Sequence, residues 1–534
     1  MENSNKSTQL ESVLWGCADI LRGKMDANEY KDYILGLLFY KYLSDKLLYT
    51  AEAETRNEGD PKLTVAERQK RYEQYYSDPD FVQELKANAG FVLDPKLTFE
   101  SLMGDIERNE FQLGTLSKAF NEIEGFGENF ANVFDDVDLN SKKLGNTEAA
   151  QNKVISELMS KLDEVDLLDY STDALGDAYE YMLGQFASET GKKAGEFYTP
   201  TAVANLMAHI VMLGHENKEG LQVYDPTCGS GSLLLDIGRY SNKKETIHYW
   251  GQELNASTYN LAKMNMMIHG ITLEHQHLHN GDTLDADWPT EEETDFDCVV
   301  MNPPYSAKWS AEPGFLNTPR FSSYGALAPK SKADYAFLLH GFYHLKKDGT
   351  MGIVLPHGVL FRGAAEGTIR KKLIDDGSIY AVIGLPANLF YNTTIPTIIM
   401  ILKKDRGDMS RDILFIDASK DFEKGKNQNK LTEQNATDIL KLYIDRKDVE
   451  KKAHLASYDE IVKNDYNLNI PRYVDTFDAP EAINISDVNE ELKSVNAEIK
   501  ENTKSLVESL GELTSDDEKL NKDIQDLIEI LKEE

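Results

Sequence analysis

The segment VYDPTCGSGSLLLDIG, residues 223–238, has the pattern of a short buried strand, a glycine-rich turn and the start of a helix. Gly229 and Gly231 allow the backbone of this turn to approach a ligand closely, and the following helix offers free N–H groups. The turn lacks the spacing G-x-G-x-x-G of dinucleotide-binding folds, and no lysine follows it as in a P-loop. A dinucleotide or a nucleoside triphosphate is therefore not the first expectation, and a tight turn without a ligand explains this segment alone equally well.

Short apolar runs alternate with helical stretches on both sides of this segment, between about residues 195 and 420. The runs are LQVYDP (221–226), TIHYWGQEL (246–254), FDCVVMNPP (296–304), GTMGIVLP (349–356), IYAVIGLP (379–386), TIIMILKK (397–404) and DILFIDAS (412–419). Such alternation predicts an α/β fold, in which a doubly wound and mainly parallel sheet carries helices on both faces. The carboxyl ends of its strands then line one edge, where ligands bind.

Acidic residues stand at the ends of the first three expected strands. Asp225 follows the first strand, Glu253 ends the second in WGQELN (250–255), and Asp282 follows the third in NGDTLDAD (280–287). An acid in the position of Glu253 can hold the ribose hydroxyls of a nucleoside, and Asp282 is available to an adenine amino group. Each acid alone is typical of a solvated loop. Together with the glycine turn they describe an adenosine pocket without a phosphate site, which indicates S-adenosyl-L-methionine.

A rigid polar corner, Asn302-Pro303-Pro304-Tyr305, ends the fourth expected strand. The two prolines have fixed φ angles and no N–H to donate. The Asn302 side-chain oxygen and the Pro303 carbonyl can accept both N–H bonds of an adenine amino group, which localises the nitrogen lone pair and stabilises the transition state of methyl transfer. Tyr305 is expected to stack on the base, which must be flipped out of the duplex. The structural alternative is a rigid strand stop.

A further helix is expected to begin within GEFYTPTAVANLM, residues 195–207. Thr199 and Pro200 are a good pair for the N-cap and the first turn. Phe197 and Tyr198 precede this helix, where their rings could line the cofactor pocket or simply belong to the core. The expected buried face consists of Val203, Leu206, Met207 and Ile210.

The flanking regions predict three domains: a helical N-terminal domain (1–165), the catalytic domain (166–475) and a C-terminal helical segment (476–534). Asp26 and Glu29 form a predicted capping box at the start of a helix. Further helices are expected over 150–168 and 173–187. The charged stretch 54–80 is predicted to be a surface excursion. The last segment carries an apolar seam typical of one long helix or a coiled coil. The seam consists of Val488, Leu492, Val495, Ile499, Leu506, Leu513, Leu520, Ile524, Leu527 and Leu531, with Asn502 in one seam position.

The formal net charge of the 534 residues is −34, which is unusual for a protein that grips nucleic acid by itself. Either the substrate is not nucleic acid, or a partner supplies much of the DNA contact. Three widely spaced cysteines favour a reducing cytoplasm, and no metal site is predicted. We expect no signal peptide and no membrane span.

The motifs GEFYTP, DPTCGSGSLLL, GQELN, GDTL and NPPY, in this order, resemble those of the adenine-N6 DNA methyltransferases. The similarity is greatest to the modification subunit of type I restriction–modification systems, and the stretch LWGCADILRGKMDANEYKDYILGLLFYKYLSD (14–45) resembles its helical N-terminal domain. NPPY alone is shared with protein-glutamine and some RNA methyltransferases, whereas GEFYTP upstream of the glycine turn is far more restrictive.

The resemblance implies specific site residues and S-adenosyl-L-methionine as the cofactor. The catalytic corner would be Asn302, Pro303, Pro304 and Tyr305. The implied cofactor contacts are Glu196, Phe197, Tyr198, Thr199, Pro200, Thr201, Ser230, Gly231, Ser232 and Glu253, together with Asp225 and Asp282.

The resemblance also implies partners. In type I systems a separate specificity subunit reads double-stranded DNA, two modification subunits join one specificity subunit, and a restriction subunit completes the nuclease. This division accounts for the acidic charge, and the C-terminal seam is a plausible dock for the specificity subunit.

Three other functions stay open on the sequence. A stand-alone adenine-N6 methyltransferase would need its own base-reading domain, against which the acidic flanks argue. A protein-glutamine methyltransferase is usually smaller and would not be expected to carry GEFYTP. An inactive scaffold subunit is disfavoured by the intact acids and the intact corner.

Overall fold

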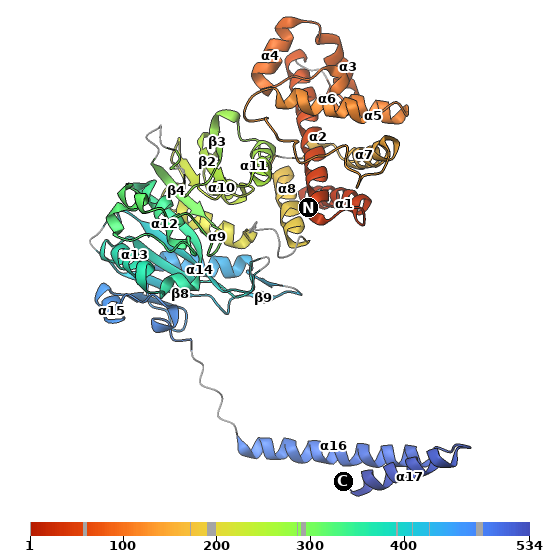
Figure 1. The fold of residues 1–534 in the computed structure, drawn as a ribbon, viewed down its shortest axis with the longest axis vertical. Coiled ribbons are helices and arrows are strands. Elements are labelled where there is room, and N and C mark those ends of the chain that lie inside the picture. Colours follow the sequence, from red (N-terminus) through yellow and green to blue (C-terminus); the bar gives the residue numbers. More distant parts are fainter. Residues whose placement is uncertain are drawn as a thin grey trace. The chain divides into compact units, whose positions relative to one another are not determined.

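The computed structural model describes residues 2–56, 61–170, 172–189, 199–285, 287–289, 295–390, 393–407, 410–426, 428–476 and 484–533. The chain divides into two compact units, Met1–Thr476 and Phe477–Glu534 (Figure 1). Among the described helices, none is long and apolar enough to cross a membrane. The domain boundaries expected at residues 165 and 475 stay predictions.

A nine-stranded sheet runs through the first unit in the order β11-β8-β6-β7-β5-β4-β1-β2-β3. Its strands are β1 Gln222–Asp225, β2 His248–Glu253, β3 Gln276–Asn280, β4 Phe296–Met301, β5 Leu345–Pro356, β6 Ile379–Gly384, β7 Thr397–Lys403, β8 Ile413–Asp417 and β11 Ala453–Ala456. Strands β1 to β5 pair in parallel, whereas β7 runs antiparallel between β5 and β6, and β11 runs antiparallel to β8. The predicted doubly wound sheet is confirmed, and it is mixed rather than wholly parallel. A separate two-stranded ribbon joins β9 Glu423–Lys424 to β10 Asn429–Lys430.

The direction of winding reverses between β1 and β4. The chain passes from β1 outward to β2 and β3, and then returns to pair β4 with the other side of β1, where Val223 faces Cys298 and Tyr224 faces Val299. The loops at the carboxyl ends of β1 and β4 therefore leave toward opposite faces of the sheet, and ligands of open α/β sheets bind at such a switch point. This topology positions the loop after Asp225 beside the corner that begins at Asn302.

Helices cover both faces of the sheet. Alternate residues of β4 point to opposite cores: Val299 and Met301 pack beneath α12 and α13, and Cys298 and Val300 pack beneath α9 and α10. This alternation follows from the two-residue period of a strand that is buried on both faces. The helices of the sheet region are α9 Thr201–Met212, α10 Ser232–Gly238, α11 Ala256–Ile268, α12 Asp334–Tyr343, α13 Ala364–Asp375, α14 Glu433–Asp445 and α15 Tyr458–Lys463.

The N-terminal region is helical, as predicted. Its helices are α1 Glu2–Leu21, α2 Ala27–Thr55, α3 Val65–Tyr75, α4 Pro79–Ala89, α5 Phe99–Glu107, α6 Leu113–Glu124, α7 Glu148–Leu162 and α8 Thr172–Glu189. The capping box of Asp26 and Glu29 is present at the start of α2. Most described residues of the stretch 54–80 are exposed, but the stretch is not only a surface excursion, because α3 buries Arg68 and Tyr72 on one side. The Arg68 guanidinium is paired with Glu52 of α2 at 2.6 Å, and such a pairing makes burial of a charged residue possible.

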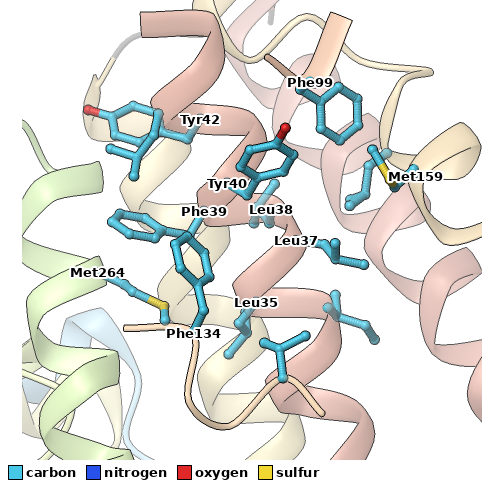
Figure 2. Close-up of a cluster of buried hydrophobic side chains, with 14 of the residues drawn as sticks. Leu35, Leu37, Leu38, Phe39, Tyr40, Tyr42, Phe99, Phe134, Met159 and Met264 are labelled. Carbon is cyan, nitrogen blue, oxygen red and sulfur yellow. The ribbon is translucent and has the colours of Figure 1, made fainter. Parts of the chain in front are cut away.

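The N-terminal helices share a hydrophobic core with the sheet region. Figure 2 shows Met264 of α11 directed toward Phe134, beside Phe39 of α2. The Tyr42 hydroxyl of α2 donates to the Met267 carbonyl of α11 at 2.8 Å. Helix α11 therefore packs on the sheet with one face and on the N-terminal helices with another.

The second unit contains two helices, α16 Ile485–Gly511 and α17 Glu518–Glu533, which pack as a hairpin (Figure 1). Of the two expected forms, one long helix or a coiled coil, the single helix is wrong because α16 ends at Gly511. Ile528 of α17 is buried against α16, whereas the seam residues at the start of α16 remain exposed. These residues, here called the α16 seam, are Ile485, Val488, Leu492, Val495 and Ile499.

Substitution of Gly176 by alanine should destabilise the first unit by about 1–3 kcal/mol, a typical cost of overpacking. An added Cβ at this position of α8 would lie 2.3 Å from the His269 ring, which is held by a bond to the Asn265 carbonyl. The matched control is Gly114→Ala in α6, where no atom lies within 4 Å of the added Cβ. The control should be neutral or stabilising by up to about 1 kcal/mol. Thermal unfolding followed by circular dichroism measures both, and equal effects would contradict the tight α8–α11 contact.

Candidate active site

The corner after β4 is held by its own side chains and by a distant segment. Asn302 is buried, and its Nδ2 donates to Thr199 Oγ1 at 3.0 Å. The Asn302 Oδ1 atom accepts from the Tyr305 hydroxyl at 2.9 Å. Both ends of the amide are thus bonded, and Oδ1 has a fixed direction at the carboxyl edge of the sheet.

Thr199 does not have the role in the helix that the sequence suggested. Pro200 is the N-cap of α9, and its carbonyl accepts from the N–H groups of Val203 and Ala204. The Thr199 hydroxyl is therefore not a helix cap but a partner of Asn302. The predicted buried face of this helix, Val203, Leu206, Met207 and Ile210, is confirmed.

The turn that follows the corner is anchored from behind. Ser306 has a φ of 53°, and its N–H donates to Asp334 Oδ1 at 2.8 Å. The other oxygen of Asp334 accepts from Arg362 at 2.9 Å, and the same Arg362 nitrogen also donates to Glu366 at 3.2 Å. Because Asp334 is buried and charge-paired, the positive φ at Ser306 is supported by the strongest class of hydrogen bond.

The glycine turn after β1 is bonded to the end of β2. Gly229 and Gly231 have φ angles of 56° and 82°, which favour glycine. The Gly229 N–H donates to Glu253 Oε2 at 3.1 Å, and Asn255 N–H donates to Glu253 Oε1 at 2.8 Å. Two strand ends that the sequence placed at one edge are therefore joined through a single carboxylate.

Asp225 is a deeply buried acid at the end of β1. Its Oδ1 accepts from the Thr227 N–H at 2.8 Å and from the Thr227 hydroxyl at 3.2 Å. The pKa of Asp225 is raised to about 8: burial is the largest cause, the Thr227 hydrogen bonds oppose it, and the nearby charge of Glu253 adds to it. A cationic ligand group beside this carboxyl would favour its ionised form.

Asp282 lies in the loop after β3 and is half-buried. Its Oδ1 accepts from the Leu284 N–H at 2.9 Å. The neighbouring Thr283 hydroxyl donates to the Pro226 carbonyl, which follows Asp225. The third strand end is thus bonded to the first.

The structure brings most of the predicted site residues to this edge. Ser232 begins α10 directly after Gly231, Ser230 Oγ lies 3.3 Å from Ser232 Oγ, and Thr201 begins α9. Pro303 is buried and Pro304 is half-buried beside Asn302. Glu196, Phe197 and Tyr198 lie outside the described residues.

Asn265 is a residue of this site that sequence reasoning missed. It is fully buried on α11, and its Nδ2 donates to the Ser230 carbonyl of the glycine turn at 2.9 Å. The available signal was an amide inside the apolar run NLAKMNMMI, because a buried amide needs a polar partner.

Comparison with known proteins agrees with the family resemblance that the sequence motifs indicated. The model of the N-6 DNA Methylase family matches residues 170–482, and the HsdM N-terminal domain matches residues 10–162. The methylase subunit of the type I restriction enzyme MpnII of Mycoplasma pneumoniae is 36% identical, over 91% of this chain and 93% of that protein. The MjaVII methylase subunit of Methanocaldococcus jannaschii is 32% identical, over 91% and 81% of the two chains.

A solved structure is also similar along most of the chain. The crystal structure of the type I restriction–modification methyltransferase subunit from Streptococcus thermophilus is 55% identical, with a TM-score of 0.85. The similarity covers 88% of this chain and 100% of that one.

The raised pKa of Asp225 predicts a specific dependence of stability on pH. The pKa of this carboxyl is about 8 in the folded protein, whereas that of an unfolded aspartate is about 4. The folded state therefore binds the proton more tightly, and the contribution of Asp225 to stability is present at low pH and is lost as the pH rises between these two values. Replacement by asparagine should remove this loss, up to about 1.4 kcal/mol for each pH unit. Unfolding midpoints at pH 5.5, 6.5, 7.5 and 8.5 measure it.

The matched control is Asp297→Asn. The buried Asp297 pairs with Lys218 and Lys346, and the pKa of this carboxyl is lowered although burial opposes the change. It is ionised in both states across this pH range, so its replacement should cost stability by the same amount at each pH. A parallel pH profile for wild type and Asp225→Asn would contradict the assignment for Asp225.

Proposed function

The chain belongs to the N-6 DNA methylase family, with the HsdM N-terminal domain, and from this premise we propose how its own residues act. It is an adenine-specific DNA methyltransferase that uses S-adenosyl-L-methionine. We infer that the methylated atom is N6 of an adenine flipped out of the duplex and held at the corner of residues 302–305. The observation that carries this proposal is the fixed direction of Asn302 Oδ1 at the switch point of the sheet.

Asn302 is the proposed acceptor for the adenine amino group. Its Oδ1 now accepts from the Tyr305 hydroxyl, so the incoming amino group takes the place of that hydroxyl. Thr199 keeps its bond to Nδ2 and thereby holds the amide in the same orientation. The Tyr305 ring is proposed to stack on the base, and the Pro303 carbonyl is the proposed second acceptor.

Once the adenine amino group has replaced the Tyr305 hydroxyl at Asn302, each residue of the corner has a proposed role in methyl transfer. S-adenosyl-L-methionine supplies a methyl group on its sulfonium, and transfer makes N6 positively charged until it loses a proton. The oxygen atoms of Asn302 and Pro303 stabilise that positive charge more in the transition state than in the ground state. Tyr305 and the rigid prolines keep the base in position during the reaction.

The cofactor is proposed to bind along the ends of β1, β2 and β3. The Glu253 carboxylate, which holds Gly229 and Asn255, is proposed to accept from the ribose hydroxyls. Asp225 is proposed to face the positive part of the cofactor, and Asp282 to face the adenine amino group. The remaining proposed contacts are residues 196–201 and 230–232.

The partner of the proposed complex is a specificity subunit. Its support is the net charge of −34, which disfavours DNA binding by this chain alone, together with the exposed α16 seam. We propose that two copies of this chain join one specificity subunit through this hairpin, and that a restriction subunit completes the nuclease on double-stranded DNA. A cytoplasmic location is part of the same proposal.

Replacement of Asn302 by alanine should reduce N6-methyladenine formation by at least about 100-fold, the usual cost of removing one such acceptor or donor. Tritiated methyl transfer to plasmid DNA, with the specificity protein of the same locus present and product nucleosides identified by mass, is the measurement. Cofactor affinity by calorimetry should stay within about threefold, since the acids are unchanged. The control is the exposed Asn242→Ala, which should retain full activity.

Normal methylation by the Asn302→Ala enzyme would contradict the role of the corner. Equal activity of wild-type chain with and without the specificity protein would favour a stand-alone methyltransferase. Transfer to protein rather than DNA would favour the glutamine methyltransferases.

Charged substitutions in the α16 seam should separate partner binding from cofactor binding. Leu492→Asp with Ile499→Asp replaces two exposed apolar residues of the seam and should abolish co-purification with the specificity protein. Ser494→Asp with Ala497→Asp adds the same charge on another face of α16 and should leave the complex intact. Size-exclusion chromatography with light scattering measures the complex, and equal loss in both variants would exclude the seam as the dock.

A further inference from the structure

One buried arginine links the segment after the catalytic corner to the loop that carries Asp282. Arg320 lies between β4 and α12 and is 2% exposed. Its Nη1 donates to the Thr283 carbonyl at 3.0 Å, and its Nη2 donates to the Leu284 carbonyl at 3.3 Å. The planar guanidinium therefore holds two successive carbonyls of the GDTL motif in a fork geometry that lysine cannot reproduce.

The carbonyls that Arg320 holds belong to the same short turn as the Asp282 carboxylate. The Leu284 peptide donates its N–H to Asp282 Oδ1, while the Leu284 carbonyl accepts from Arg320. The Thr283 hydroxyl is bonded to the Pro226 carbonyl. The direction of the Asp282 side chain is thus set by a turn that is fixed on one side by the chain after β1 and on the other by Arg320.

A group of Asp287 and two buried histidines lies beside this arginine. Asp287, His340 and His344 have ligand atoms within 4.8 Å of one another, a composition that suits a transition metal. The Arg320 Nε atom lies 3.7 Å from Asp287 Oδ1, and Nη1 lies 3.1 Å from His340 Nδ1. The guanidinium already supplies the positive charge that this group needs, and a second cation beside it would be repelled.

The hydrogen bonds fix the role of His340 in this group. The Tyr224 hydroxyl donates to the Trp288 carbonyl at 2.8 Å and lies 2.8 Å from His340 Nε2. Since its one proton is used, His340 Nε2 donates to it, and Nδ1 is left to accept from Arg320. Burial holds the pKa of His340 well below its usual range, with the charges of His344 and Arg320 acting in the same direction.

We propose that Arg320 is a positioning residue for cofactor binding, which acts by fixing the turn that presents Asp282. The proposal rests on the proposed function in one respect, the assignment of Asp282 as a contact of S-adenosyl-L-methionine. Arg320 belongs to the segment that follows the target-base corner, and its guanidinium joins this segment to the loop that carries Asp282.

The test is a double-mutant cycle on Arg320 and Asp282 in the complex with the specificity protein. Arg320→Ala and Asp282→Ala should each raise the KM for S-adenosyl-L-methionine at least about tenfold, with kcat at saturating cofactor within about threefold. If Arg320 acts through Asp282, the double variant should be no weaker than the Asp282 single variant by more than about twofold. Arg320→Lys should lie between wild type and Arg320→Ala, since an ammonium can hold one carbonyl.

Arg370→Lys is the matched control, because Arg370 is also buried and donates to the carbonyls of Val359, Arg362 and Tyr466. It should lower the unfolding midpoint and leave the KM for the cofactor unchanged. Multiplicative effects in the double variant, or a fall in kcat and unfolding midpoint without a change in KM, would overturn the proposal. If Arg320→Ala does not fold, an unchanged cofactor KM in Arg320→Lys overturns it equally.

The proposed function can fail separately. In that case the wild-type complex forms no N6-methyladenine. The affinity of the chain alone for S-adenosyl-L-methionine, measured by calorimetry, can still be compared among the wild type, the two single variants and the double variant. Non-additive losses of affinity would then support the positioning role without DNA methylation.

Discussion

Parallel pairing of β1 with β4 is the constraint on which the arrangement of the active site depends. It puts the carboxyl end of β1, with Asp225 and the glycine turn, next to the carboxyl end of β4, where Asn302 begins the corner. The loops that leave these two ends run toward opposite faces of the sheet, which is the arrangement in which open α/β sheets bind their ligands. The remaining contacts, from Glu253 to Gly229 and from Asn302 to Thr199, fix the positions of these loops.

The sequence allowed prediction of the features that depend on local pattern. The apolar runs, the glycine turn and the acids at strand ends follow from two-residue periodicity and from turn chemistry, both of which are legible over a few residues. The bond of Thr199 to Asn302 joins positions 103 residues apart, so no local pattern reveals it. The burial of Arg68 could not be predicted from its charged surroundings, because its partner Glu52 lies on another helix. Strand β11 could not be predicted because its sequence lacks a strong apolar run.

Helix α11 explains why the N-terminal helices and the sheet region form one compact unit. Ala262 and Met266 belong to the core on the sheet, whereas Met264 and Met267 belong to the core of the N-terminal helices. A helix that is apolar on nearly all sides must be covered on nearly all sides. The same helix carries Asn265, which holds the glycine turn, so packing between the two regions and the geometry of the cofactor turn depend on one element.

This double burial has a consequence for modular exchange among relatives. A chimera that takes only residues 1–165 from one homologue would join a foreign N-terminal core to the native α11, and the methionines on that helix would meet unmatched neighbours. Recombination that keeps the two faces compatible has to transfer α11 together with the N-terminal helices, although the glycine turn and β2 lie between them in the chain. A chimera of this protein therefore has to be matched at α11 as well as within its first 165 residues.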